Sequence, residues 1–335
     1  MRLREGVAID LGTVNTLVCV TGRGTVVDEA SAIALDRASG RVAAVGHAAD
    51  ALAGKEPQNI EVIHPLRDGV IADLDAAAAM LQAFLRKAQL RRGRLRASAV
   101  VCVPGGATWV ERRSLEAVVG AIRPRCEVRL IDEPVAAAAG AGFDLADGSG
   151  AFIVDIGGGT TQAAVMAGGQ LVRAQSLRLG GNAMDEAIMN TVRAELGLLI
   201  GRNAARNLKT TLGLAGGEGT PGWVEAVGVD AARRTPRVER VQGKLVAGAL
   251  EHTVAAMITT VEEMLSDIPP NLAEDVVRGK IRLAGGGALL PGLASRIESA
   301  TGIPVVVVDD PLRCVIRGAA AVIERGDGLV PTQVA

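Results

Sequence analysis

Two segments far apart in the chain share one pattern of apolar and polar residues. Residues 7–13 read Val-Ala-Ile-Asp-Leu-Gly-Thr and lead into the apolar run 16–20. Residues 152–161 read Phe-Ile-Val-Asp-Ile-Gly-Gly-Gly-Thr-Thr and lead into the apolar run 163–166. Each predicts a strand with an aspartate near its carboxyl end, a glycine-containing turn and a second strand. One such hairpin is weak evidence, but two that head the two halves of a chain predict a duplicated core.

Between and after these hairpins the pattern alternates between helices and strands. Thr108 and Glu111 have the spacing of a helix-capping box, and Pro134 suits the first turn of a helix. This alternation predicts an α/β protein. The predicted helices cover 74–90, 108–122, 184–200, 204–212 and 246–265, with others after residues 133, 287 and 308, and the predicted strands cover 99–103, 128–131, 280–284 and 304–308.

Two stretches fit this alternation poorly and predict small subdomains inserted into the larger ones. Residues 33–73 have a mixed pattern with several turns, and residues 212–242 are rich in Gly, Pro and Thr. We therefore expect a first core subdomain over 1–32, 74–146 and 322–335, with 33–73 inserted into it. A second core subdomain covers 147–183 and 243–321, with 184–242 inserted into it. Residues 325–335 read as a flexible tail.

Composition narrows the class of protein. The chain has 335 residues, enough for two domains with cores of their own, and its 22% charged and 49% apolar residues are typical of a folded protein. No apolar run reaches the roughly 18 residues of a spanning helix, and residues 1–6 run straight into a strand with no signal peptide. We therefore expect a cytoplasmic protein. A net charge of -1 and the absence of tyrosine argue against nucleic acid as a partner.

The hairpin turns are suited to phosphate groups. A triphosphate needs backbone N–H donors and a divalent cation, and small residues let the backbone approach it closely. Asp10 and Asp155 are expected to face each other across the phosphates and to hold Mg²⁺, directly or through water. Either aspartate alone would be interpreted as a turn residue, but the matched pair favours the metal role. The chain has no Walker A sequence and no Gly-x-Gly-x-x-Gly fingerprint before a helix.

Longer literal motifs resemble those of the MreB family of actin-like ATPases, in the family's order from residue 6 to about residue 325. They are Asp10-Leu-Gly-Thr-Val-Asn-Thr, Asp68-Gly-Val-Ile-Ala-Asp73, Val103-Pro-Gly-Gly, Val110-Glu-Arg-Arg113, Glu133-Pro134, Asp155-Ile-Gly-Gly-Gly-Thr-Thr161, Met184-Asp-Glu-Ala-Ile188, Leu199-Ile-Gly201 and Ala284-Gly-Gly-Gly-Ala-Leu-Leu290.

The resemblance implies the actin-like ATPase fold, in which duplicated core domains with two small inserted subdomains surround a nucleotide cleft. It implies ATP or ADP and Mg²⁺ as cofactors, and polymerisation with other copies into paired protofilaments. These would lie under the cytoplasmic membrane, on an anionic membrane surface, and guide the cell-wall elongation machinery.

The resemblance also implies roles for individual residues. Glu133 would orient the attacking water, with Thr160 and Gln162 beside it. The expected phosphate ligands are Gly12, Thr13, Val14, Asn15, Gly157, Gly158, Gly159 and Thr160. The expected ribose and base contacts are Arg206, Lys209, Gly285, Gly286, Gly287 and Ala288.

Four positions depart from the family's pattern and indicate a divergent paralogue. Gln162 and Arg206 each stand where a Glu is usual, Asn182 replaces an Asp, and Asp132 replaces a Glu. We expect ATP hydrolysis to be slow and the change Gln162→Glu to speed it. The alternative, that Gln162 faces away from the cleft and packs on the sheet, stays open because the glycines of the turn can shift the register. Arg206 leaves the preference between ATP and GTP open.

A basic loop is the candidate for membrane contact. Arg91, Arg92, Arg94 and Arg96 surround Leu95 where MreB relatives commonly carry an apolar pair that enters the membrane. Each arginine near an anionic surface contributes about 1 kcal/mol. A solvated loop without a lipid partner is an equally good interpretation of the residues alone.

Two other classes of protein share the expected fold. A sugar or acyl kinase would use Asp10 and Asp155 in the same way, but it is generally longer and needs a polar acceptor pocket, for which the chain offers no motif. A chaperone-type ATPase would need a further substrate-binding domain after about residue 335.

Overall fold

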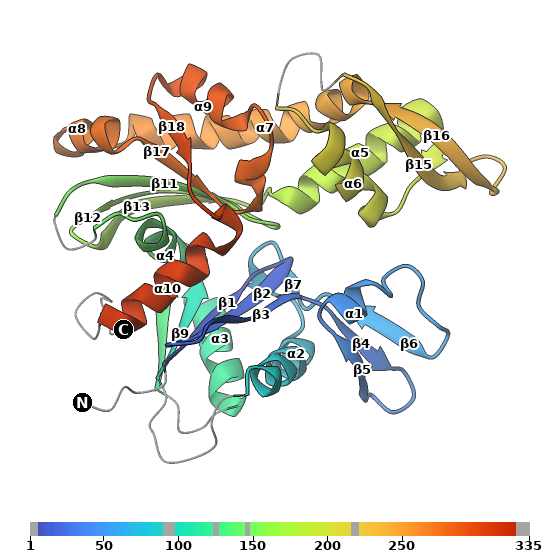
Figure 1. Cartoon of the computed structure of the whole chain (residues 1–335), viewed down its shortest axis with the longest axis horizontal. Coiled ribbons are helices and arrows are strands. Elements are labelled where there is room, and N and C mark those ends of the chain that lie inside the picture. Colours follow the sequence, from blue (N-terminus) through green and yellow to red (C-terminus); the bar gives the residue numbers. More distant parts are fainter. Residues whose placement is uncertain (1–5, 90–97, 123–126, 145–147, 216–220, 326–335) are drawn as a thin grey trace.

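The computed structural model describes residues 6–89, 98–122, 127–144, 148–215 and 221–325, and it has two halves that each contain a five-stranded sheet (Figure 1). The basic loop at 91–96 and the tail from 326 on lie outside the described residues. Within the described part, no helix combines the length and the apolar character that crossing a membrane requires.

The first sheet carries the first of the two repeated hairpins. Asp10 pairs with Leu17 across the antiparallel hairpin β1–β2, while β9 and β10 continue the sheet parallel to β1. Helices α2 (Leu74–Lys87) and α3 (Trp109–Ile122) cover one face of this sheet. The strand order is β10 (Glu127–Asp132), β9 (Ser98–Val103), β1 (Gly6–Leu11), β2 (Asn15–Val20) and β3 (Gly24–Ala30).

The second sheet repeats this arrangement around the second hairpin. Its strand order is β13 (Gln170–Leu177), β12 (Thr161–Ala167), β11 (Ala151–Ile156), β17 (Ile281–Ala284) and β18 (Val305–Val307). In both sheets an antiparallel hairpin lies next to strands that run parallel to its first strand. The predicted duplication is therefore confirmed. The outer helices of this half are α7 (Gly243–Ser266), α8 (Pro270–Gly279) and α9 (Leu293–Thr301).

Two helices lie between the sheets and join the halves: α4 (Glu133–Gly140) and α10 (Cys314–Arg325) (Figure 1). They belong to one apolar cluster that also contains Ala8 and Val100 of the first sheet and Ile153 and Ala164 of the second. The helices touch along their backbones, since a Cβ atom at Gly318 would overlap the carbonyl oxygen of Ala136. The two halves thus share one apolar core around α4 and α10.

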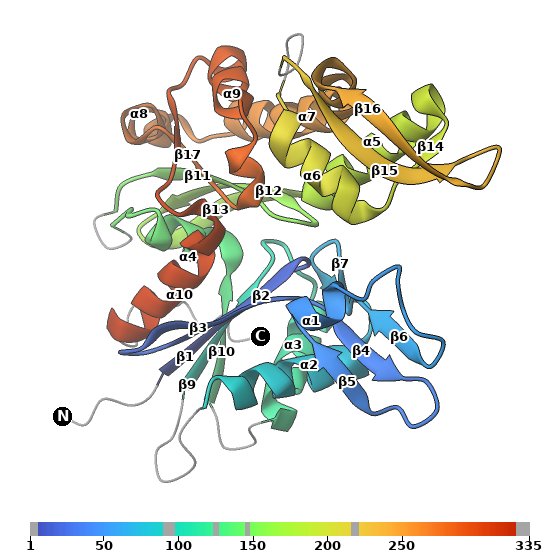
Figure 2. The same ribbon diagram turned by 45° about the vertical axis from the view of Figure 1, so that its right-hand side comes forward.

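Two small subdomains extend from the same side of the two halves (Figure 2). The first contains the sheet β5 (Val42–Val45), β4 (Ile33–Asp36) and β6 (Ile60–Ile63), the helix α1 (His47–Asp50) and the hairpin β7 (Leu66–Arg67)–β8 (Val70–Ile71). The second contains α5 (Gly181–Leu196), α6 (Arg202–Leu212) and the sheet β14 (Leu198–Leu199), β15 (Trp223–Asp230) and β16 (Pro236–Gln242).

Some predicted elements are confirmed and others need correction. The capping box forms, with the Thr108 amide donating to Glu111 Oε2 over 2.7 Å. The helix predicted over 184–200 is wrong at both ends. It begins at Gly181 and ends at Leu196, because Gly197 adopts a left-handed conformation with φ 60° and the next two residues pair with β15. Helix α8 was not predicted.

Candidate functional site

A cavity of about 720 Å³ opens between the two halves, and it borders their shared core at Leu17 and Val315. Residues from both repeated hairpins line it, together with parts of the second inserted subdomain and the turns after β17 and β18. Two residues predicted for the site are not in its lining: Gln162 lies behind it, and Ala288 is buried in the core of the second half. The predicted residues that do line it are Asp10, Gly12, Thr13, Val14, Asn15, Glu133, Asp155, Gly157, Gly158, Gly159, Thr160, Arg206, Lys209, Gly285, Gly286 and Gly287.

The two strand-end aspartates enter this cavity from opposite halves. Asp10 is the fifth residue of β1 and Asp155 the fifth residue of β11, so the repeat places both at corresponding positions. Burial raises the pKa of Asp10 to about 7, with a further contribution from the charge of Asp155, and burial raises the pKa of Asp155 to about 6. Two carboxylates that repel each other in a buried site favour a cation between them.

The two carboxylates of the cavity fit an Mg²⁺ ion that is also bound by the phosphates of a nucleotide. Among the described residues, no three His, Cys, Asp or Glu side chains are grouped closely enough to hold an ion by themselves. Mg²⁺ bound to a nucleotide usually keeps several waters and takes only one or two carboxylates besides phosphate oxygens. Asp10 and Asp155 supply that number of carboxylates, and a cation between them would offset the cost of burying their negative charges, which raises the pKa of both.

The glycine turns of the two halves approach each other so closely that larger residues would not fit. A Cβ atom at Gly159 would lie 2.6 Å from Thr13 Oγ1 and 2.9 Å from the Cα atom of Asp68. The Thr13 hydroxyl also accepts a 2.9 Å hydrogen bond from the amide of Gly69, in the turn between β7 and β8. The backbone of three segments therefore meets around the space that phosphate groups would occupy, where backbone N–H groups serve as anion ligands.

Glu133 is placed at the floor of the cavity by the end of β10 and the start of α4. Burial, and then the charges of Asp10 and Asp155, raise the pKa of its carboxyl group well above the usual range. Gln162 donates a hydrogen bond from Nε2 to Glu133 Oε2, which opposes that rise. The side chain of Gln162 therefore faces Glu133 beside the cavity, although it does not enter the cavity itself.

The cavity is also lined by a buried ion pair, of which the sequence analysis assigned Lys209 to the site but not its partner Asp185. Asp185 is 1% exposed, and its Oδ1 atom lies 2.6 Å from Lys209 Nζ. Arg206 Nε lies 3.6 Å from the other carboxylate oxygen, and Lys209 also donates to the carbonyl oxygen of Gly181 over 2.7 Å. Asp185 was detectable in principle, because it shares the buried face of α5 with Met184 and Ile188.

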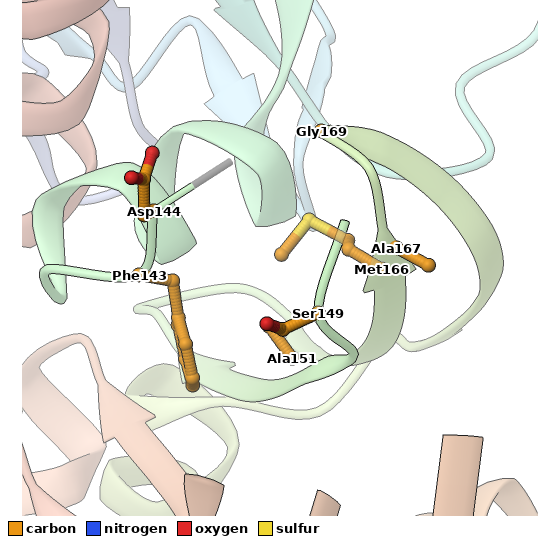
Figure 3. Close-up of a pocket in the computed structure, with 7 residues that line it drawn as sticks. All are labelled: Phe143, Asp144, Ser149, Ala151, Met166, Ala167 and Gly169. Carbon is orange, nitrogen blue, oxygen red and sulfur yellow. The ribbon is translucent and has the colours of Figure 1, made fainter. Parts of the chain in front are cut away.

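A second cavity lies between the loop after α4 and the end of β12, where Phe143, Asp144, Ser149 and Met166 surround it (Figure 3). Its volume is about 30 Å³, against about 720 Å³ for the cavity between the halves, so it does not accommodate a nucleotide. The basic loop at 91–96 lies outside the described residues, and its contact with a membrane stays a prediction.

The comparisons with known proteins agree with this geometry. A model of the MreB/Mbl protein family matches residues 4–330. The chain belongs to the MreB/Mbl family. The cell shape-determining protein MreB of Escherichia coli (strain K12) is 42% identical over 326 residues, which cover 96% of this chain and 93% of that protein.

Solved structures match the fold of the whole chain. MreB5 of Spiroplasma citri, solved bound to ADP, is 30% identical with a TM-score of 0.89, and the match covers 95% of each chain. The MamK double helical filament is 23% identical with a TM-score of 0.80, covering 96% of this chain and 99% of that one, and shares the fold. The predicted actin-like fold and MreB-type family are confirmed, and nothing in these matches supports the sugar or acyl kinase alternative.

Proposed function

We propose that this chain is a nucleotide-dependent cytoskeletal protein that binds ATP or ADP with Mg²⁺ in the cleft between its halves. The observation that carries the proposal is the meeting of two matched Asp–Gly hairpins, one from each half, in a single cavity of nucleotide size. MreB5 of Spiroplasma citri has been solved with ADP and with AMPPNP, which supports the same ligand class here. Four subdomains with boundaries near those predicted from the sequence would surround this nucleotide.

The expected arrangement of the nucleotide follows from the chemistry of the lining. The phosphates lie at the glycine turns, with Mg²⁺ held near Asp10 and Asp155 and partly through water. The nucleoside extends toward Lys209 and the turn that starts at Gly285, because these residues line the same cavity and do not belong to the two hairpin turns. Glu133 then lies on the phosphate side, where a carboxylate can orient a water for attack on the γ-phosphate.

Calorimetric titration of Mg-ATP tests this assignment. We expect the parent to bind Mg-ATP, to lose affinity when EDTA removes the metal, and to lose it when Asp155 is changed to Ala. The control is Glu274→Ala, which removes a carboxylate that is paired with Arg278 on the surface of α8, far from the cavity. Equal affinity of the parent and Asp155→Ala for Mg-ATP would refute the assignment of the metal site.

Self-association belongs to the same proposal. We expect end-to-end polymerisation into paired protofilaments, as the MreB resemblance implies, and membership of a family of cell shape-determining proteins supports it. The protein would act under the cytoplasmic membrane together with the cell-wall elongation machinery.

Peripheral membrane contact would come from the basic loop at 91–96, and many copies in a filament would strengthen it. Because the attraction is electrostatic, flotation with anionic liposomes should decrease as salt is added. If flotation is the same after all four arginines of the loop are changed to Ser, the loop is not the membrane contact.

A further inference from the structure

Gln162 is enclosed by protein beside the cavity and does not line it. Its side chain is 1% exposed and lies on β12, directly opposite Asp155 in the antiparallel pair β11–β12. Residues that are directly opposite in such a pair point to the same face of the sheet. The register therefore directs Gln162 toward the floor of the cavity, next to the carboxylates, even though the side chain stops short of the open space.

The contacts of Gln162 decide the orientation of its amide group. The backbone N–H of Gly105, in the turn after β9, can only donate, and it lies 2.5 Å from Gln162 Oε1. That contact fixes the carbonyl end of the amide toward Gly105 and leaves the Nε2 end toward Glu133 Oε2. A rotated amide would place an N–H group against an N–H group at Gly105. The side chain is thus held at both ends by protein groups.

We propose that Gln162 is a positioning residue for ATP hydrolysis, which holds one oxygen of the Glu133 carboxylate and is itself anchored by the amide of Gly105. Because this donor holds Oε2 of Glu133, the other carboxylate oxygen would be left to orient a water in the cavity that Glu133 helps to line. Gln162 then acts on the attacking water through Glu133 and not by contact with the water. This inference rests on the proposed ATP hydrolysis.

This geometry reverses the effect that the sequence alone predicts for Gln162→Glu. A carboxylate at position 162 can still accept from Gly105, but it offers no N–H to Glu133 and places a second negative charge beside it. Two neighbouring carboxylates repel each other, so the carboxylate of Glu133 would lose its fixed orientation. The variant should therefore hydrolyse ATP more slowly than the parent.

Single-turnover hydrolysis and nucleotide binding, measured on the same variants, test the proposal. Gln162→Leu removes the hydrogen bonds to both Gly105 and Glu133 at similar side-chain volume. Gln162→Glu removes only the N–H donor to Glu133 and can still accept from Gly105. The second variant therefore tests the proposal even if the first does not fold. We expect each to lower the single-turnover rate by about 10- to 100-fold, because misplacement of a catalytic group by about 1 Å has effects of that size. The affinity for Mg-ATP should change less than about twofold, because Gln162 does not line the cavity and reaches the proposed ligand site only through Glu133.

A double-mutant cycle separates a positioning role from a general structural role. Once Glu133 is changed to Ala, Gln162→Leu should have no further effect on the rate, because it acts through a group that is no longer present. The matched control is Gln175→Leu, which removes a 2.9 Å amide-to-carboxylate hydrogen bond between the edge strand β13 and Glu263 of helix α7. The control should leave the rate unchanged.

Three results would overturn the proposal. The first is faster ATP hydrolysis by Gln162→Glu than by the parent. The second is that the rate losses of Gln162→Leu and Glu133→Ala multiply in the double mutant, and the third is a loss of Mg-ATP affinity that accounts for the loss of rate. Each leaves the proposed ATPase intact, since the parent still turns over. A parent that binds Mg-ATP and shows no turnover would overturn the proposed hydrolysis, and this inference with it.

Discussion

Changing Gly318 to Ala tests whether the two halves depend on the close contact between α4 and α10. A Cβ atom at this position would overlap the carbonyl oxygen of Ala136 and lie 2.6 Å from the amide nitrogen of Gly140. Ordinary van der Waals contact begins at 3.4 Å, so the helices would have to separate by at least 0.8 Å along a backbone contact that cannot rotate away. Strain of this kind in a packed core costs about 1–3 kcal/mol or more.

The helix propensity of alanine offsets part of that cost, by about 1 kcal/mol relative to glycine. Separation of the helices also loosens the shared apolar cluster, where Ala137, Ala319 and Ile316 are fully buried. We therefore expect Gly318→Ala to lower the free energy of unfolding by about 1–2 kcal/mol, which is the upper part of the overpacking cost less the gain in helix propensity. Because α4 begins with Glu133, the same change should also weaken Mg-ATP binding or its turnover.

Urea denaturation, followed by circular dichroism, measures the effect against a matched variant. Gly248 also lies inside a helix, α7, but a Cβ atom there would meet nothing within 4 Å. Gly248→Ala should therefore raise the free energy of unfolding by about 0.5–1 kcal/mol through helix propensity alone. If Gly318→Ala is as stable as Gly248→Ala, the contact between α4 and α10 is not a constraint and the reasoning is refuted.

Three further predictions concern the charged groups of the cavity. Lys209→Met should lower the free energy of unfolding in urea by about 3–5 kcal/mol, because it leaves Asp185 buried beside only the more distant Arg206; an unchanged stability would contradict the assigned pair. Affinity for Mg-ATP in calorimetry should fall as the pH drops from 8 to 5.5, because protons compete with the cation at Asp10 and Asp155, whose pKa values are raised to about 7 and about 6. The stability of the ligand-free protein should change in the opposite direction. The folded state keeps protons that the unfolded chain loses near pH 3.8, so the free energy of unfolding should decrease as the pH rises from about 4 to 7. A pH-independent affinity and a flat stability profile would refute these assignments.

The features that local sequence determines could be predicted. Each Asp–Gly hairpin is contained in fewer than twenty residues, so its strands, its turn and the position of its aspartate are visible in the pattern, as is the capping box at Thr108. The meeting of the two hairpins followed from their repetition. The end of α5 did not follow, because the apolar pattern continues past Gly197, and the pairing of β14 with β15, about thirty residues later, decides the structure there.

The site was predictable at the level of strand ends and turns, and less so at the level of side-chain contacts. Gln162 was assigned to the site, but its direction depends on the register with Asp155 and on a donor from a third strand end, at Gly105. Asp185 was quoted in a motif without a role, because its partner Lys209 lies on a different helix. Such contacts between elements are set by tertiary packing, which the pattern along one strand or helix does not contain.

Sedimentation of the purified chain with nucleotide tests the central claim most directly. The account predicts that the parent pellets at high speed with Mg-ATP and stays in the supernatant when EDTA replaces the metal. It also predicts that Asp155→Ala stays in the supernatant under both conditions, because it does not retain the Mg-nucleotide that joins the halves. A parent that stays in the supernatant at every concentration of Mg-ATP, or that pellets equally with EDTA, would contradict a nucleotide-dependent filament.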